Sequence, residues 1–116
     1  MSQVRATHIL IKHSGSRRPA SWKDPEGQEI KKRSKDQAIQ ELSQLREEII
    51  AGKYVWEDVA QKVSDCGSAK AGGDLSWFGP GDMQKPFEDA TFALNIGDIS
   101  GIVDTDSGVH IIKRTG

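Results

Sequence analysis

The sequence of 116 residues contains a single cysteine and no apolar run that approaches the ~20 residues of a membrane span. One cysteine excludes an internal disulfide and a zinc site built from several cysteines, and it indicates a thiol in a reducing compartment. Residues 1–6 are too polar for a signal peptide. These absences argue against a secreted or membrane-spanning protein, so we expect a protein of the cytoplasm and nucleus with no membrane partner.

Aromatic residues make up only 6% of the chain, whereas 35% of the residues are hydrophobic and 28% are charged. These fractions are typical of a folded chain and argue against intrinsic disorder. A chain of 116 residues has the size of one ordinary domain with one modest core. We therefore expect residues 1–116 to form a single domain that acts as a monomer.

The net charge of −1 conceals a strong separation of charge along the chain. Residues 1–35 hold nine Lys or Arg against three acids, a net charge of +6, and residues 36–116 hold seven against fourteen, a net charge of −7. A basic end suits an anionic ligand, but the acidic remainder argues against wrapping a nucleic acid. Binding of RNA or DNA is a minor alternative, and we expect no nucleic-acid partner.

The basic end contains a long loop, over about residues 12–35, in which Lys12, Arg17 and Arg18 surround three small residues. Two guanidinium groups and an ammonium can donate paired hydrogen bonds to the oxygens of a phosphomonoester, which makes phosphate the first ligand to consider. Charge alone is more often that of a solvated loop that contacts nothing. The run KKRSK at residues 31–35 is open to two interpretations, a nuclear signal or a solvated charge run.

Periodicity predicts an α+β domain with a small antiparallel sheet and helices packed on it. A capping box at Ser34 and Gln37 marks the start of the first helix. The predicted helices cover residues 34–52, 55–63 and 86–94, and the predicted strands cover residues 4–11, 74–78, 99–103 and 109–113, with a hairpin loop over residues 105–108. In the first strand, period two places His8 and Leu10 on one face and Ile9 and Ile11 on the other.

Three tryptophans have different expected places. Trp56 lies on a helical apolar face and Trp77 in a predicted strand, so both are expected in the core. Trp22 lies within the basic loop and is expected to brace it.

Six ordered sequence blocks resemble the parvulin peptidyl-prolyl isomerases, specifically their phosphorylation-directed Pin-type subclass, over residues 4–115. The blocks are THILIKH at 7–13, SRRPASW at 16–22, SDCGSA at 64–69, GGDL at 72–75, MQKPFEDA at 83–90 and TDSGVHII at 105–112. The resemblance implies a parvulin-like fold of the FKBP-like superfold, a four-stranded antiparallel sheet surrounded by about four helices. The chain begins close to the first strand, so we expect a member of the subclass without an N-terminal WW domain.

The resemblance also implies an activity, the cis/trans isomerisation of phosphoSer-Pro and phosphoThr-Pro bonds in phosphorylated proteins, without metal or cofactor. It assigns the phosphate to Lys12, Arg17 and Arg18. The implied proline pocket consists of Leu75, Met83 and Phe87 with Gln84 beside it, and the implied catalytic group consists of His8, Cys66, Ser107 and His110 with Thr105 in support. Gly67 departs from the serine that is familiar after the catalytic cysteine, which removes a hydroxyl near the phosphate end.

Each of these residues also has an ordinary structural interpretation. The apolar residues of the implied pocket fit a simple core, and His8 and His110 fit a structural pair bonded across neighbouring strands. Cys66 with a histidine could indicate a thiol hydrolase, but the chain shows no evident oxyanion-hole motif. Two further alternatives remain open: a phosphopeptide-binding module with little turnover, and a parvulin that prefers acidic or unmodified residues before proline.

Overall fold

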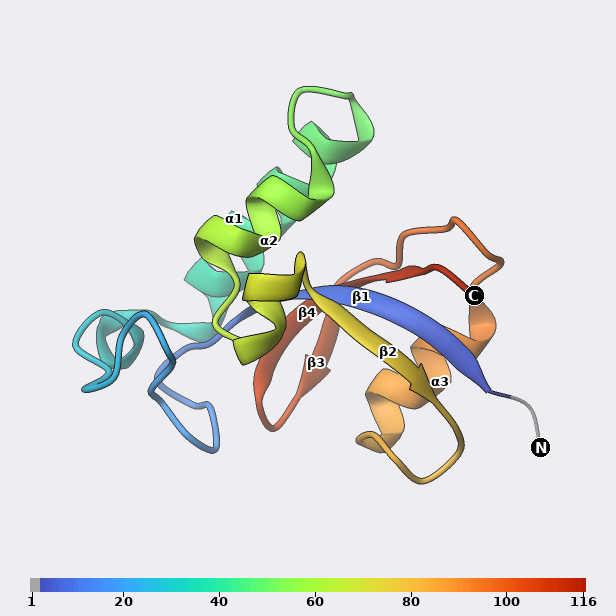
Figure 1. Cartoon of the computed structure of the whole chain (residues 1–116). Coiled ribbons are helices and arrows are strands. Elements are labelled where there is room, and N and C mark those ends of the chain that lie inside the picture. Colours follow the sequence, from blue (N-terminus) through green and yellow to red (C-terminus); the bar gives the residue numbers. More distant parts are fainter. Residues whose placement is uncertain (1–2) are drawn as a thin grey trace.

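A computed structural model describes residues 3–116 and has the predicted α+β architecture (Figure 1). The strands are β1 (Val4–Ile11), β2 (Asp74–Phe78), β3 (Val103–Thr105) and β4 (Gly108–Arg114). Where about four helices were expected, residues 3–116 contain three α-helices, α1 (Lys35–Ile50), α2 (Trp56–Val63) and α3 (Lys85–Ala93), and two short 3₁₀ helices, η1 (Ile30–Lys32) and η2 (Gly67–Ala71). None of the helices within residues 3–116 is long and apolar enough to cross a bilayer.

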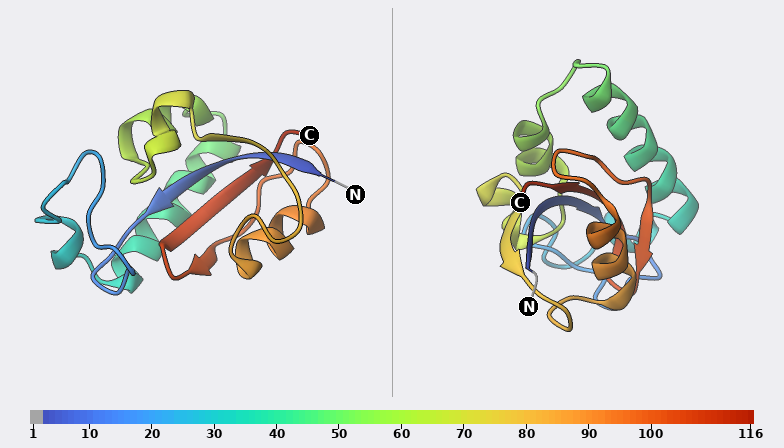
Figure 2. Two further views of the ribbon diagram at one scale, coloured as in Figure 1. Left: turned by 60° about the horizontal axis from the view of Figure 1, so that its bottom comes forward. Right: turned by 90° about the vertical axis from the view of Figure 1, so that its right-hand side faces the viewer.

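The four strands form one antiparallel sheet in the order β2-β1-β4-β3, so β1 and β4 are its central strands. Helices α1 and α2 cover one face of this sheet and α3 covers the other (Figure 2). The predicted alternation in β1 is confirmed, because Ile9 and Ile11 pack in the cluster beneath α1 and α2. Val4 and Ala6 belong to the cluster that contains Phe87 of α3. His8 and Leu10 share that second face.

The first predicted helix begins where the capping box placed it. Ser34 Oγ accepts the backbone N–H of Gln37 at 3.1 Å, and Gln37 Oε1 accepts the N–H of Ser34 at 2.8 Å. These bonds satisfy two of the groups that a helix N-terminus leaves unpaired. Leu42, fully buried, anchors α1 against the sheet, and Trp56 of α2 is buried as predicted.

The C-terminal hairpin differs from the prediction in the position of its first strand. That strand covers Val103–Thr105 in place of residues 99–103, and the loop is a two-residue turn formed by Asp106 and Ser107. Pairing with β4 also occurs earlier in the chain, where the prediction placed it: Ile99 forms an isolated bridge with Lys113, and the Ser100 N–H donates to the Ile112 carbonyl at 2.7 Å. The ladder is interrupted between Ser100 and Val103. There the Ser100 Oγ accepts the N–H of Ile112 at 2.9 Å, and the Ser100 carbonyl accepts Arg46 Nε at 2.7 Å.

Trp77 is not a core residue, contrary to the prediction. It lies on the edge strand β2 and is 53% exposed. The preceding Ser76 has a φ of 63°, an unusual conformation for a residue other than glycine, and Trp77 packs beside Gly116 at the C-terminus. Apolar character alone therefore misplaced Trp77, because an edge strand leaves one face open to water.

Candidate active site

All nine residues of the expected proline pocket and catalytic group line one hollow of about 300 Å³. They are His8, Cys66, Leu75, Met83, Gln84, Phe87, Thr105, Ser107 and His110. The hollow lies on the α3 face of the sheet, where β1, β2 and β4 meet the N-terminus of α3. Leu10 and Asp82 also line it and were not predicted. The period of β1 could have identified Leu10, because it lies two residues after His8 on the same face.

The apolar wall of this hollow depends on how α3 begins. Pro86 stands in the first turn of α3, where a missing backbone N–H removes no helical hydrogen bond. This start places Phe87 in the first turn, 4% exposed, with its ring centroid 5.4 Å from that of His8 and 5.1 Å from that of His110. Leu75 and Met83 pack against the same cluster.

The two histidines face each other across the central strands. His8 Nδ1 lies 3.0 Å from His110 Nδ1, and His110 Nε2 lies 2.8 Å from Thr105 Oγ1. Burial lowers the pKa of His8 to about 4, and burial together with the neighbouring His8 ring lowers the pKa of His110 to about 3. Both rings are therefore neutral at pH 7, and one Nδ1–H donates to the other Nδ1. The pair is bonded as the structural interpretation expected, and His8 Nε2 has no hydrogen-bond partner within the described chain.

Acidification should destabilise the protein through this pair. An unfolded histidine has a pKa near 6.5, so between about pH 6.5 and the folded values the unfolded chain binds more protons and unfolding becomes easier as pH falls. We expect the free energy of unfolding in urea to drop between pH 7.5 and pH 5 by up to about 2 kcal/mol for each ring, and to be flat above pH 7.5 with respect to these groups. Ring protons of His8 and His110 that titrate near pH 6.5 in NMR spectra of the folded protein would contradict this expectation.

Gln84 joins the pocket to the turn between β3 and β4. Its Nε2 donates to Ser107 Oγ at 2.8 Å, and its Oε1 accepts the backbone N–H of Asp106 at 3.2 Å. The Ser107 N–H donates to Thr105 Oγ1 at 3.2 Å, which links the turn to the histidine pair. Gln84 thus fixes the position of the Ser107 hydroxyl at the rim of the pocket.

A second hollow of about 590 Å³ lies next to the first and contains part of the predicted phosphate group. Lys12 and Arg18 line it, and Cys66 and Ser107 line both hollows. Arg17 does not line it, but its backbone N–H donates to the Asp106 carbonyl at 2.7 Å, which places Arg17 beside the β3–β4 turn. The two guanidinium groups are exposed and form no salt bridge with any residue of the described chain, so both are free for an anion.

Lys12 differs from the two arginines because it already has partners. Its Nζ donates to the carbonyl oxygens of Arg18 at 3.0 Å and Ala20 at 2.7 Å. Partial burial lowers the pKa of Lys12, and the nearby Asp65 opposes that shift. Lys12 therefore holds the loop in shape and has one ammonium hydrogen left for a ligand.

Asp65, the residue before Cys66, holds the basic loop in place and was not predicted as a site residue. Its side chain is 2% exposed; it accepts the Lys12 N–H at 2.9 Å and the Ser21 hydroxyl at 3.0 Å, and Arg33 Nη1 lies 3.6 Å away. Trp22 Nε1 donates to the Ser64 carbonyl at 3.0 Å, so Trp22 braces the loop as expected. The acid stood next to the cysteine in the block SDCGSA, but its burial could not be inferred from that position.

Gly67 stands where a serine is familiar in the family, and the structure shows whether a serine would fit there. A Cβ at Gly67 would meet no atom within 4 Å, so serine fits without strain. We expect Gly67→Ser to fold with unchanged or slightly higher stability, by up to about 1 kcal/mol, because glycine loses more chain entropy on folding. Urea unfolding measures this effect; a loss above 1 kcal/mol would mean that the backbone at Gly67 requires glycine.

Cys66 Sγ has no hydrogen bond to either histidine within residues 3–116, which counts against a thiol-imidazole nucleophile. In the same described part of the chain, no three His, Cys, Asp or Glu side chains gather as metal ligands do.

Comparisons with known proteins agree on one family. The family model described as "Rotamase: PPIC-type PPIASE domain" matches residues 8–116. The chain is 64% identical to "Peptidyl-prolyl cis-trans isomerase Pin1" of Malus domestica, over 99% of this chain and 95% of that protein. It is 66% identical to the protein of the same name from Arabidopsis thaliana, over 97% of this chain and 95% of that protein.

Solved structures give the same result for the fold. The "Peptidyl-prolyl isomerase ESS1 from Candida albicans" superposes with a TM-score of 0.93 at 48% identity and covers 98% of this chain, which spans 63% of that longer one. TbPIN1 superposes with a TM-score of 0.89 at 50% identity, and the match covers all of both chains.

Proposed function

Because the chain belongs to the PPIC-type, or parvulin, family and is a Pin1-type peptidyl-prolyl cis/trans isomerase, we propose that it acts on prolyl bonds preceded by phosphoserine or phosphothreonine. The observation behind this proposal is the pair of exposed guanidinium groups of Arg17 and Arg18, which form no salt bridge within residues 3–116. Arg18 lines the second hollow, and the Arg17 N–H donates to the Asp106 carbonyl in the β3–β4 turn. The hollow beside Arg18 shares Cys66 and Ser107 with the proline pocket. A phosphate on the residue before proline would meet these guanidinium groups while the proline ring lies against Phe87.

The reaction requires rotation about a bond and no change of covalent structure. Breaking the amide resonance presents a barrier of about 18 to 20 kcal/mol, and the uncatalysed exchange takes tens to hundreds of seconds. A catalyst must hold the proline ring, hold the preceding residue at a second point, and favour the twisted amide over the planar one. The apolar pocket and the phosphate site supply the two points of attachment.

The pocket also favours the twisted state electrostatically. The planar amide is the more dipolar state, and Leu75, Met83 and Phe87 remove the water that would stabilise it. The neutral His8–His110 pair keeps a cation out of the site and orders the floor of the pocket through Thr105. A gain of about 10⁵ in rate corresponds to about 7 kcal/mol, which positioning and preorganised dipoles can supply.

Cys66 acts in this proposal through its electron density near the prolyl carbonyl and not as a nucleophile. We expect Cys66→Asp to retain at least about a tenth of wild-type kcat/KM, because a carboxylate keeps electron density at that position, and Cys66→Ala to retain less. Both variants should give wild-type NMR fingerprints. A folded Cys66→Asp protein without activity would contradict the electrostatic role and favour a covalent one.

Phosphorylated Ser/Thr-Pro proteins are the partners that this specificity implies, and we propose that the enzyme meets them as a monomer in the cytoplasm and nucleus.

The specificity is tested with three tetrapeptides that carry phosphoserine, glutamate or serine before proline, in a protease-coupled isomerisation assay. We expect kcat/KM to be at least about 100-fold higher for phosphoserine than for serine, because two charge-assisted contacts are added. Equal values for glutamate and phosphoserine would identify a parvulin for acidic residues, and equal values for all three would remove the phosphate site.

A further inference from the structure

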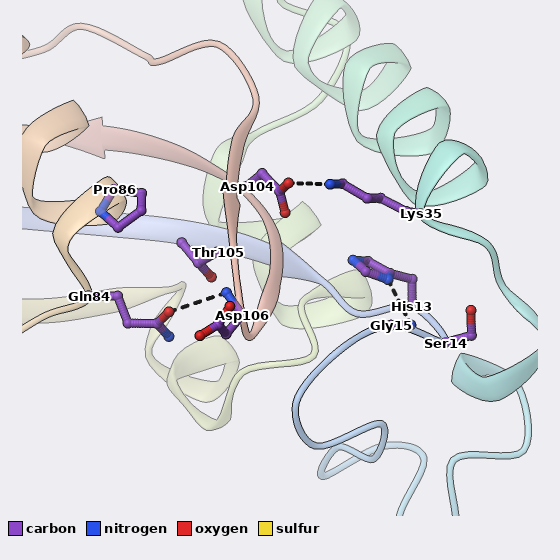
Figure 3. A pocket seen from close by; sticks show the side chains of 9 residues that line it. All are labelled: His13, Ser14, Gly15, Lys35, Gln84, Pro86, Asp104, Thr105 and Asp106. Atoms are coloured by element: carbon purple, nitrogen blue, oxygen red, sulfur yellow. Dashed lines mark hydrogen bonds and ion pairs between the residues drawn. The ribbon is translucent and has the colours of Figure 1, made fainter.

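The basic loop between β1 and α1 is closed at its base by hydrogen bonds. The Ser14 N–H donates to the Arg33 carbonyl at 2.8 Å, so the two ends of the loop lie side by side. Next to this closure, the buried ring of His13 accepts the Gly15 N–H at its Nδ1, at 3.0 Å (Figure 3). The loop therefore leaves the body of the protein from a fixed origin, and its shape depends on the contacts made within it.

The segment that carries the two arginines is held at its N-terminal end by the β3–β4 turn. The Arg17 N–H donates to the Asp106 carbonyl at 2.7 Å. The Asp106 N–H in turn donates to Gln84 Oε1 at 3.2 Å, as Figure 3 shows, so this end is fixed relative to the proline pocket. After the arginines, the Arg18 carbonyl accepts Lys12 Nζ at 3.0 Å. Both arginines thus have a fixed backbone while their side chains are exposed.

A second arm of the loop packs against Pro19, the residue that follows the two arginines. Gly27 is buried and has a φ of 71°, and a Cβ at this position would collide with the Pro19 carbonyl oxygen. Only glycine combines this φ with so close an approach of two backbones. Because proline restricts the residue before it to extended conformations, the position of Pro19 also limits the backbone of Arg18.

Asp24 holds Gly27 in that position. Its carboxylate accepts the backbone N–H groups of Gln28, Glu29 and Ile30 at 2.9, 3.0 and 3.0 Å. These hydrogen bonds, above all that of Ile30, lower the pKa of Asp24, so the carboxylate is ionised at neutral pH. The Asp24 carbonyl accepts the Gly27 N–H at 3.0 Å, and Ile30 is 1% exposed. A line of contacts therefore runs from the protein interior at Ile30 through Asp24 and Gly27 to the segment with the arginines.

We propose that Gly27 is a positioning residue for the substrate phosphate, because its close contact with Pro19 presets the arrangement of the two adjacent arginines. Two guanidinium groups that are already in place bind a phosphate with less loss of conformational freedom than a mobile loop does. A substrate without phosphate gains nothing from this arrangement, so Gly27 affects the discrimination between substrates and not the rotation in the proline pocket. The inference rests on the proposed function for the role of Arg17 and Arg18.

The test compares kcat/KM for a phosphoSer-Pro peptide with that for its unphosphorylated twin, in the wild-type protein and in Gly27→Ala. A loss of folded protein lowers both values equally, so their ratio reports on the phosphate site and not on stability. We expect Gly27→Ala to lower the ratio by about tenfold, chiefly through KM for the phosphopeptide, because displaced guanidinium groups no longer donate paired bonds. The NMR order parameters of the backbone at residues 17–19 should fall from about 0.85 to below about 0.6.

Further variants separate the collision with Pro19 from the strain of a left-handed backbone. Gly52→Ala is the matched control: Gly52 has a φ of 80°, but a Cβ there meets no atom within 4 Å, so this variant should lose stability in urea and keep the ratio unchanged. Gly27→Asn tolerates a positive φ better than alanine but brings the same collision, so it should lower the ratio as far as Gly27→Ala does. Asp24→Ala, which keeps Gly27, should lower the ratio by about threefold or more.

The outcomes distinguish this inference from the proposed function. A ratio near one in the wild-type protein would overturn both. A high wild-type ratio that stays within about twofold in the Gly27 and Asp24 variants, or that Gly52→Ala lowers to the same extent, would overturn this inference alone. Wild-type order parameters below about 0.6 at residues 17–19 would also overturn it, because the arginines would then not be held in place before the phosphate binds.

Discussion

Replacing Arg17 and Arg18 together by alanine is expected to lower kcat/KM for a phosphoSer-Pro peptide by about 100- to 1000-fold, with little change for its unphosphorylated twin. Both guanidinium groups are exposed and unpaired in the described chain, so their removal disturbs no internal contact. Charge-assisted hydrogen bonds contribute about 1.5 to 3 kcal/mol each, and two of them account for a loss of this size. The protease-coupled assay with both peptides measures the loss.

The control removes the same amount of charge elsewhere in the basic segment. Lys31 and Lys32 are exposed residues of the 3₁₀ helix η1 and form no salt bridge in the described part of the chain. Their double alanine variant should change the rate on the phosphopeptide by less than about threefold, through long-range attraction alone. Equal losses in the two double variants would show that net charge, and not a located phosphate site, determines the specificity.

Asp65→Ala is expected to produce the largest loss of stability of any change considered, about 3 kcal/mol or more. The carboxylate is almost completely buried; it accepts hydrogen bonds from Lys12 N and Ser21 Oγ and neutralises Arg33. Removing one partner of a buried charged network leaves the other groups unpaired, which costs more than the bonds themselves. Urea unfolding at pH 7.5 measures the change in free energy.

Two variants separate burial from charge in that experiment. Asp74→Asn breaks the Arg5–Asp74 pair, whose side chains are 45% and 33% exposed, and should cost no more than about 1 kcal/mol. Ser21→Ala removes one of the Asp65 bonds and should also cost about 1 kcal/mol. A loss for Asp65→Ala no larger than that for Asp74→Asn would mean that the loop is held by its other contacts.

The features that periodicity and local chemistry determine were predictable from the sequence. The capping box at Ser34 predicted where α1 begins, and the alternation in β1 predicted the two faces of that strand. The structure confirms both predictions. The family blocks named nine residues from five separate segments that line one hollow. No periodicity could have gathered them, because their proximity comes from the antiparallel pairing of β1 with β4 and from the start of α3.

Features that depend on tertiary competition for hydrogen bonds were not predictable. The pairing with β4 is interrupted between the isolated Ile99–Lys113 bridge and β3, where Ser100 bonds to Ile112 through its side chain and to Arg46 through its carbonyl. Asp65 is an acid that an ordinary pattern places on the surface, yet the loop folds over it. His13 likewise gave no signal in the sequence, because its buried Nε2 becomes apparent only once the loop bends back to Gly15.

Two-dimensional NMR exchange spectroscopy on a phosphoSer-Pro peptide and its unphosphorylated twin, with catalytic amounts of the protein, shows whether the protein isomerises the phosphorylated bond. We expect cross-peaks between the cis and trans proline signals for the phosphopeptide within a second, at a temperature where the free peptide exchanges over tens of seconds or longer. The twin should give no such cross-peaks. Equal exchange in both peptides would contradict the phosphate site, and tight binding of the phosphopeptide without exchange would contradict catalysis at the pocket that contains His8, Cys66 and His110.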